Sequence, residues 1–191
     1  MKKLLLLGIA LFCVQAASAQ KIAIKNNLIY DAALTPNLAL EFGLGKKTTL
    51  DLGGGYNWYD LDKDKHKKLR HWLAQPELRF WACERFNGFF WGIHAHGGEF
   101  NVSNIDAPFG LMDWLKDHRY EGHFYGGGVS IGYQWILGKR WNLEASIGGG
   151  YARYSYDKYD AYDRCADCME SRDKNYWGVT RATLSFIFFL R

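Results

Sequence analysis

The chain has 191 residues, a formal net charge of +4, 17% aromatic residues, 21 Gly and only 3 Pro. This length leaves no room for two ordinary domains, and aromatic residues combined with many Gly are typical of strands and turns rather than helices. A charge this small does not indicate a nucleic acid partner.

The first segment has the features of a secretory signal. Two lysines at residues 2–3 precede an apolar stretch over residues 4–14, and small residues at positions 17 and 19 form a cleavage site. We therefore expect a signal peptide over residues 1–19 and a mature domain over residues 20–191. No later stretch contains the roughly 20 apolar residues of a spanning helix, so any membrane crossing would use strands.

Eight segments of the mature chain have the composition or alternation of strands. They are residues 21–32, 37–44, 48–59, 70–83, 88–101, 119–135, 141–156 and 175–191. Each is about long enough for a tilted membrane strand, which takes roughly 9–11 residues. In the last segment Ala182, Leu184, Phe186, Phe188 and Leu190 share one face. Apolar alternation that continues to the C-terminus is typical of bacterial outer-membrane β-barrels.

The connections between these segments alternate in length. The short ones contain Gly, as hairpin turns do, and occupy residues 45–47, 84–88 and 137–140. The long ones are charged and occupy residues 60–69, 102–118 and 157–174. The first connection, at residues 34–37, is short where the alternation requires a long loop. Because short turns at one end and long loops at the other are typical of a barrel with both termini in the periplasm, we predict an all-β, eight-stranded antiparallel up-and-down transmembrane β-barrel.

The alternative is a soluble barrel, whose apolar face would point inward. On the third segment Leu50 and Leu52 alternate with Asp51 and Asn57, and elsewhere the polar face carries few Lys and many Gly, which suits a narrow interior. Aromatic residues stand near strand ends, as the interfacial girdles of membrane barrels require: Trp58, Trp72, Trp135, Trp141 and Tyr151. We therefore expect the apolar side chains to face lipid.

Four segments resemble signature segments of the domain of unknown function 3575 family of Bacteroidota. They are residues 26–37 (NNLIYDAALTPN), 41–47 (EFGLGKK), 75–88 (QPELRFWACERFNG) and 133–143 (YQWILGKRWNL). The resemblance extends over essentially the whole mature chain. It implies an outer-membrane barrel of unassigned activity whose relatives are often encoded near surface-fimbria components, and it supplies no catalytic residue.

Charged and imidazole side chains share the polar face of their strands. We expect this lumen charge network to contain Glu41, Asp51, Glu77, Arg79, His94, His96, Glu144 and Arg181. Opposite charges in a narrow bore can pair and fill it, since unpaired buried charges are costly. The alternative is that Glu77, His94 and His96 form an acid/base or metal site, because a His-x-His pair on a strand places both rings on one face. Since two structural histidines explain the pattern equally well, we expect no metal and no cofactor.

The cysteines have different expected roles. Cys165 and Cys168 lie in the last long loop and are candidates for a disulfide, because the secretory route is oxidising. Free or intermolecular thiols and a metal site are the alternatives, although the loop over residues 157–174 contains no His. We expect Cys83 to be a small, inert, buried side chain on the inward face at the end of its strand.

The long loops contain the candidate contacts to partners. Five cations are candidates for binding lipopolysaccharide phosphates, and equally could form a solvated loop: Lys63, Lys65, Lys67, Lys68 and Arg70. Aromatic residues in segments 114–125 and 151–162 could contact proteins or glycans.

The sequence favours a non-enzymatic outer-membrane protein with a structural or interaction role. Its expected partners are outer-membrane lipid, lipopolysaccharide and surface appendage proteins. The alternatives are an enzyme that acts on lipid or peptide at the external rim, and a narrow channel. The acidic and His residues expected at the rim show no defensible spacing of nucleophile and base: Asp106, Asp113, Asp117, His118, Glu121 and His123.

Overall fold

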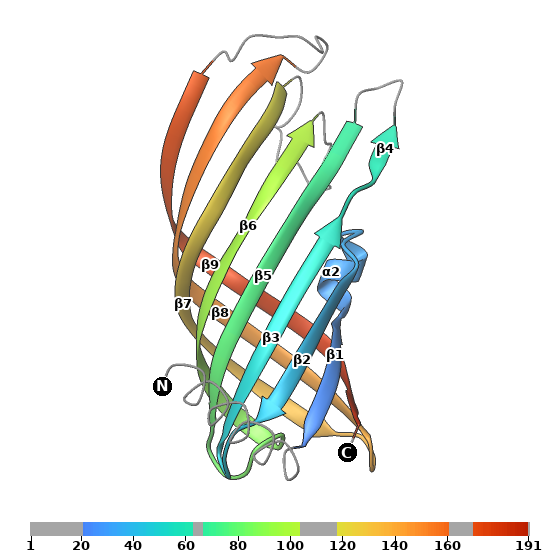
Figure 1. Cartoon of the computed structure of the whole chain (residues 1–191). Helices are drawn as coiled ribbons and strands as arrows, with labels where there is room; N and C mark the ends of the chain where they lie inside the picture. The colour runs from blue at the N-terminus through green and yellow to red at the C-terminus, as the bar shows by residue number, and fades with distance from the viewer. Residues whose placement is uncertain (1–20, 63–66, 104–117, 161–169, 191) are drawn as a thin grey trace, which may run out of the picture.

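The computed structural model describes residues 21–62, 67–103, 118–160 and 170–190. They form one antiparallel sheet that closes on itself (Figure 1). Its elements are β1 (Ile22–Asn27), α2 (Leu28–Ala32), β2 (Asn37–Gly43), β3 (Thr48–Asn57), β4 (Asp60–Asp62), β5 (Lys67–Trp81), β6 (Gly88–Ser103), β7 (His118–Ile136), β8 (Trp141–Asp160) and β9 (Glu170–Phe189).

The strand order is β3-β2-β1-β9-β8-β7-β6-β5-β4, and a further pairing of β3 with β5 closes the ring. The short strand β4 pairs with β5 beyond the end of β3, so the ring has eight positions rather than nine. The predicted all-β architecture of eight antiparallel strands is therefore confirmed. Among the residues that the structure describes, no helix is long and apolar enough to cross a membrane.

One end of the barrel, here called the turn end, carries the three short connections that the sequence predicts. The Leu44 amide donates to the Thr48 carbonyl at 2.9 Å, and the Leu137 amide donates to the Trp141 carbonyl at 3.0 Å. Gly88 ends the remaining turn with a φ of 77°, a left-handed conformation that costs Gly little because it has no Cβ. The opposite end, with the long connections, is the loop end.

The first predicted strand, over residues 21–32, is wrong in its second half. It ends at Asn27, and residues 28–32 form the short helix α2. The Asn27 Oδ1 atom accepts hydrogen bonds from the amides of Ile29 and Leu184, at 3.1 Å each. The side chain thus caps the helix and also satisfies an amide of β9, so the strand need not continue. The first connection therefore spans residues 28–36 and is no longer an exception among the loops.

The strands at the loop end are longer than predicted. β8 continues to Asp160 and β9 begins at Glu170, where the sequence predicted an end at 156 and a start at 175. Because β1 ends at Asn27, β9 pairs beyond that level with β8 alone among the described strands. The loop-end half is therefore an open curved sheet, with β9 and β4 at its two margins in Figure 1.

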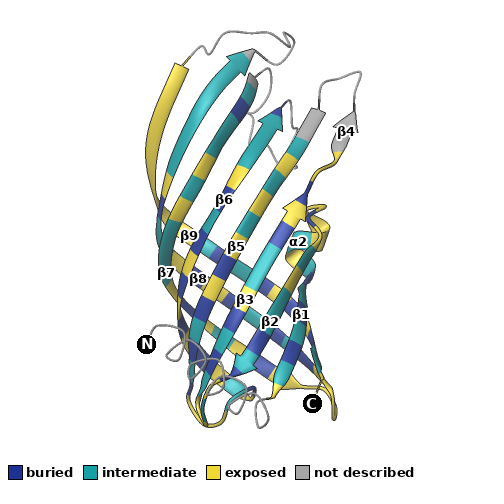
Figure 2. Cartoon of the chain, viewed as in Figure 1, coloured by how far each residue is buried: buried dark blue, intermediate teal, exposed yellow. Residues whose placement is uncertain are grey.

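Polar side chains fill the interior of the turn-end half and apolar ones cover its outside. Glu41, Asp51 and Arg79 are fully buried, whereas Val129 and Ile131 are 64% and 54% exposed. Figure 2 shows the resulting alternation of buried and exposed residues along each strand. This is the arrangement that the sequence predicts, with the faces reversed relative to a soluble barrel.

Candidate functional site

Seven charged side chains from six strands meet inside the turn-end half. They are Lys25, Glu41, Asp51, Glu77, Arg79, Glu144 and Arg181, and each is at most 5% exposed. The register places Glu41 opposite Asp51, and Asp51 opposite Glu77, on neighbouring strands. Like charges opposite one another destabilise a sheet. The three carboxylates therefore require cations, which β1, β5 and β9 supply.

Arg79 is the main cation of this network. Its Nε atom lies 2.6 Å from Glu77, and its two Nη atoms lie 2.7 Å from Asp51 and 2.8 Å from Glu144. A further contact of 3.2 Å joins it to Glu41. The guanidinium also lies over the ring of Phe90, 4.5 Å from its centroid. One side chain thus compensates carboxylates from β2, β3, β5 and β8.

Lys25 and Arg181 supply the other two positive charges. The Lys25 ammonium lies 3.1 Å from Glu41, 3.0 Å from Asp51 and 2.8 Å from Glu144. The Arg181 guanidinium lies 3.4 Å from Asp51 and 3.3 Å from Glu77. Lys25 was missed by the sequence analysis, although it shares the inward face of β1 with Ala23 and Asn27. The alternation that found the other residues would also have found it.

Neutral groups complete the filling of the bore. Thr49 donates to Glu41, Ser130 donates to Glu77, and Gln75 accepts from Arg181 at 3.3 Å. A cavity of about 30 Å³ remains beside Lys25, Asp51 and Arg181. That volume holds only two or three water molecules, at roughly 10–15 Å³ each. Charged and polar side chains therefore occupy most of the bore at this level.

An aromatic layer closes the bore at the turn end. The rings of Trp81 and Phe90 lie 4.8 Å apart, and those of Phe86 and Phe189 lie 5.2 Å apart in an edge-on arrangement. Phe86 comes from the turn between β5 and β6, yet it is only 4% exposed. The turn therefore folds a large apolar side chain back into the barrel mouth.

His94 and His96 lie in the bore but outside the ion-pair network. His94 Nε2 lies 2.9 Å from the Thr180 hydroxyl, and His96 lies beside the Phe124 ring at 6.1 Å. Glu77 lies opposite His94 in the register of β5 and β6, but its two carboxylate oxygens bind Arg79 and Ser130. Within the described ranges, no group of three or more His, Cys, Asp and Glu could hold a metal ion. The geometry thus lends no support to a Glu-His-His metal site.

Thr180 reaches the bore because β9 is irregular there. Gly148 pairs with Arg181 but Gly149 pairs with Val179, so Thr180 is the extra residue of a β-bulge. The bulge turns both Thr180 and Arg181 inward. Their side chains then contact His94 and the carboxylates, and the Thr180 carbonyl accepts from Gln75 at 3.4 Å.

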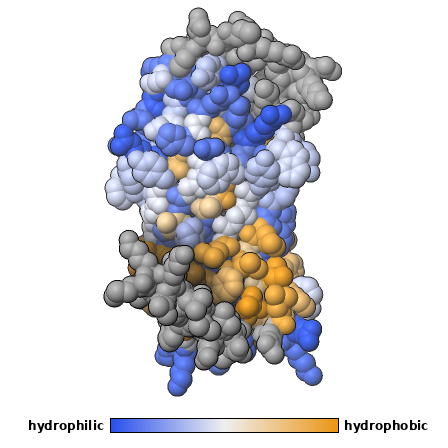
Figure 3. Space-filling model, in the orientation of Figure 1, coloured by the Kyte–Doolittle hydropathy of each residue, from blue (hydrophilic) through white to orange (hydrophobic). Residues whose placement is uncertain are grey.

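Two groups of aromatic residues, here called belts, lie on the outside of the barrel at two levels. The turn-end belt contains Phe89, Trp91, Tyr133, Trp135 and Trp141. The loop-end belt contains Tyr56, Trp58, Trp72, Tyr125 and Trp177, together with the half-buried Tyr151, whose ring centroid lies 5.0 Å from that of Trp177. Exposed aliphatic residues lie between them, among them Leu52, Ile93, Val129, Ile131 and Ile147. Figure 3 shows the visible face of the molecule, on which apolar residues gather toward the turn end and hydrophilic residues toward the loop end.

The spacing of the belts can be compared with a membrane. Along β7, ten residue steps separate Tyr125 from Trp135. At about 3.3 Å per residue and a tilt of roughly 40°, these steps span a height of about 25 Å. The apolar band of an outer-membrane barrel has about the same height.

The outer face beyond the loop-end belt is polar. On β7, β8 and β9 the residues His123, Ser155 and Asp173 lie side by side in register. Ser155 donates to Asp173 at 2.6 Å, and Arg153 donates to the same carboxylate at 2.7 Å. These two bonds hold the pKa of the Asp173 carboxyl below its usual range. Because Ser155 donates to the acid rather than to the imidazole, the three residues do not form a nucleophile and base.

The other sequence predictions have mixed outcomes. Cys83 is exposed, and the prediction of a buried side chain was wrong, because β5 ends at Trp81 and the alternation does not continue into the turn. Cys165 and Cys168 lie outside the described residues. So do Lys63 and Lys65, and the structure describes only the backbone of Lys67 and Lys68. Among the rim residues, Asp106, Asp113 and Asp117 are not described.

Arg70 is the one member of the basic loop whose side chain the structure describes. It is exposed on the outer face of β5, in the rung of residues that contains Asn101 and Glu121. The Arg70 side chain therefore lies on the polar outer face rather than above the bore.

Comparison with known proteins identifies the family. A family model described as "Protein of unknown function (DUF3575)" matches residues 4–190, which is nearly the whole chain. The chain belongs to this family. The resemblance seen in the four sequence segments is thereby confirmed. No curated protein and no protein of solved structure matches the chain.

Proposed function

We propose that this DUF3575 protein is a non-enzymatic outer-membrane β-barrel with a structural or interaction role. The observation that carries the proposal is the apolar outer band between two aromatic belts, which has the height of a membrane barrel's band. A soluble protein would gain nothing from exposing so many large apolar side chains. The predicted signal peptide over residues 1–19 supplies the route of export.

The interaction role follows from the loop-end half. The long strands β8 and β9 extend well beyond Tyr151 and Trp177, so this part of the sheet would project from the lipid. Its outer face is polar and carries exposed Arg153 and Asp173. If this surface projects from the outer leaflet, lipopolysaccharide is the neighbouring molecule that it would contact. Surface appendage proteins are the class of protein partner that the family resemblance implies.

The proposed location predicts how the protein fractionates. Cells that express the full chain should carry it in the outer-membrane fraction, with Gln20 as the first residue of the mature protein by mass spectrometry. Because a closed barrel resists detergent until heated, unboiled and boiled samples should migrate differently on gels. Recovery in the soluble periplasmic fraction, with one mobility, would contradict the proposal.

The filled bore predicts that the protein is not a channel. In planar lipid bilayers the purified protein should give no steady conductance, because four carboxylates in contact with three cations, and an aromatic layer, occupy the interior. A porin of known conductance, inserted under the same conditions, is the positive control. Reproducible conductance steps from the wild-type protein would favour the channel alternative instead.

A further inference from the structure

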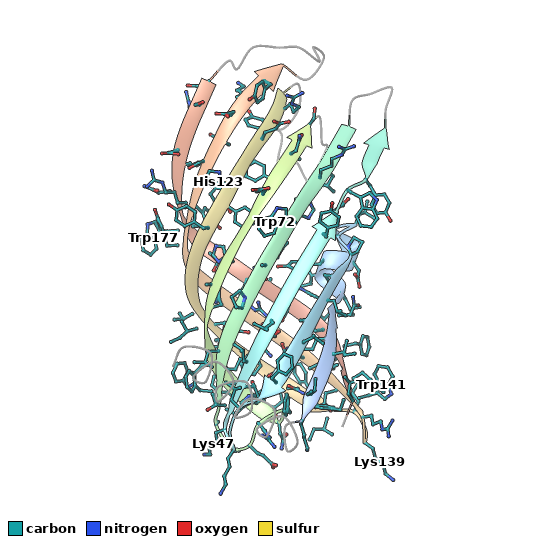
Figure 4. All side chains as sticks on the ribbon, in the orientation of Figure 1. Lys47, Trp72, His123, Lys139, Trp141 and Trp177 are labelled. Atoms are coloured by element: carbon teal, nitrogen blue, oxygen red, sulfur yellow. The ribbon has the colours of Figure 1, made fainter. Side chains whose placement is uncertain are left out.

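A shallow groove of about 630 Å³ lies on the outer face, at the boundary between the loop-end belt and the polar extension. Two rungs of residues from neighbouring strands form it. The first rung contains Tyr56, Trp72, Glu99 and His123, and the second contains Arg70, Asn101 and Glu121, with Trp58 just beyond β3. Trp72 and His123 are labelled in Figure 4. The volume is within the usual range for a small-molecule site, roughly 300–1,000 Å³.

Aromatic rings line one side of the groove and are held in place. Tyr56 and Trp58 are 54% and 56% exposed, and their ring centroids lie 5.1 Å apart. The Trp72 indole donates to the Glu99 carboxylate at 3.1 Å, which fixes both side chains. Rings of this kind combine an apolar face with a polar edge. They suit a ligand that has apolar faces and many hydroxyl groups, which describes a sugar.

The polar side of the groove supplies mainly hydrogen-bond acceptors. Asn101 donates to Glu121, and its own Oδ1 atom is buried without a hydrogen-bond partner. Two carboxylates, Glu99 and Glu121, and one guanidinium, Arg70, line the groove, and Arg119 lies 3.3 Å from Glu121. The charges therefore balance and give the groove no excess of cations for phosphate, whereas the carboxylates can accept hydrogen bonds from neutral hydroxyl groups.

The polar lining continues along the sheet. The first rung extends to Ser155 and Asp173, and the second to Asp157 and Ser171. A second depression of about 330 Å³ lies over them and shares Glu121 and His123 with the groove. Neighbouring strands lie about 4.8 Å apart, so the four strands of the groove (β3, β5, β6 and β7) alone give a width of roughly 14 Å. The surface is therefore long enough for an oligosaccharide rather than one sugar.

We propose that the groove binds neutral sugar residues of a glycolipid in the membrane around the barrel. This inference rests on the proposed function, because Tyr56 and Trp72 mark the edge of the lipid only if the apolar band is in a membrane. The groove then opens at the level of the lipid headgroups. A glycolipid with its acyl chains against the apolar band would place its sugars directly on these two rungs.

The test uses the full-length protein in lipid nanodiscs and isothermal titration calorimetry. The probe is the dephosphorylated oligosaccharide released by mild acid from lipopolysaccharide of the same cells, and inorganic phosphate is titrated separately. We expect the oligosaccharide to bind the wild type, and Trp58→Ala to weaken its affinity at least tenfold. Trp141→Ala is the matched control, because Trp141 is similarly exposed (52%) but belongs to the turn-end belt. Glu99→Gln replaces the carboxylate by an amide of nearly the same volume and should weaken binding at least threefold. This second variant tests the proposal if the Trp58→Ala protein does not assemble.

The proposal is overturned if the wild type gives no heat with the oligosaccharide, or if Trp141→Ala weakens binding as much as Trp58→Ala. It is also overturned if phosphate binds and the oligosaccharide does not. These outcomes are independent of the fractionation experiment, which tests the membrane location itself. A protein found in the outer membrane that does not bind the oligosaccharide would refute the groove alone.

Discussion

Replacement of Arg79 by Ala is expected to lower the free energy of unfolding by about 3–5 kcal/mol, or to prevent assembly. Arg79 is fully buried and contacts four carboxylates, namely those of Glu41, Asp51, Glu77 and Glu144. Its removal leaves these charges with only Lys25 and Arg181 in a closed space. Urea titration of the refolded protein in lipid vesicles, followed by tryptophan fluorescence, measures the effect.

Two further variants distinguish charge from loss of volume. Arg79→Met combined with Glu144→Met removes one charge of each sign, and should recover part of the lost stability because buried ion pairs can be replaced by apolar residues. Arg153→Ala removes an exposed arginine and its 2.7 Å contact to Asp173, and should leave the unfolding midpoint unchanged. An Arg79→Ala protein as stable as the wild type would show that the network does not hold the barrel together.

Val129→Lys is expected to cost about 2–4 kcal/mol in a bilayer, the usual penalty for Lys on the lipid face near the midplane. Val129 is 64% exposed and lies on β7 between the two aromatic belts. In a soluble barrel the same substitution at so exposed a position would change stability by less than about 0.5 kcal/mol. Urea titration in lipid vesicles therefore separates the two environments.

His123→Lys is the matched control for Val129→Lys. It lies on the same strand and the same outward face, but beyond the loop-end belt. Its replacement should not change the unfolding midpoint. Equal effects of the two substitutions would mean that the apolar band does not face lipid.

Much of the fold could be predicted because barrel strands follow a two-residue period. Seven of the eight predicted strands appear with boundaries shifted by a few residues, and the three short turns lie where Gly indicated them. The same period places Glu41, Asp51, Glu77, Arg79, Glu144 and Arg181 inside. Alternation alone was enough here, because one buried polar face and one exposed apolar face leave few possible registers.

The sequence predictions that were wrong or incomplete concern features that do not depend on the two-residue period of a strand. Residues 28–32 are apolar enough for a strand, but the Asn27 side chain caps a helix there and also accepts a hydrogen bond from the Leu184 amide of β9. The bulge at Thr180 changes which face the residues before it occupy, so the inward position of Thr180 could not be foreseen. Phe86 enters the bore from a turn, where no period applies. The groove depends on register between four strands, which single-strand patterns do not specify.

The central claim is that the band between the aromatic belts faces lipid, and spin-label accessibility along β7 tests it most directly. Single cysteines would be introduced by His123→Cys, Tyr125→Cys, Val129→Cys and Ile131→Cys after replacing native cysteines with Ser. In liposomes, labels at 129 and 131 should collide more with oxygen than with a water-soluble nickel chelate, and the label at 123 should show the reverse. Preferential access of the nickel chelate to 129 and 131 would contradict a membrane-embedded barrel.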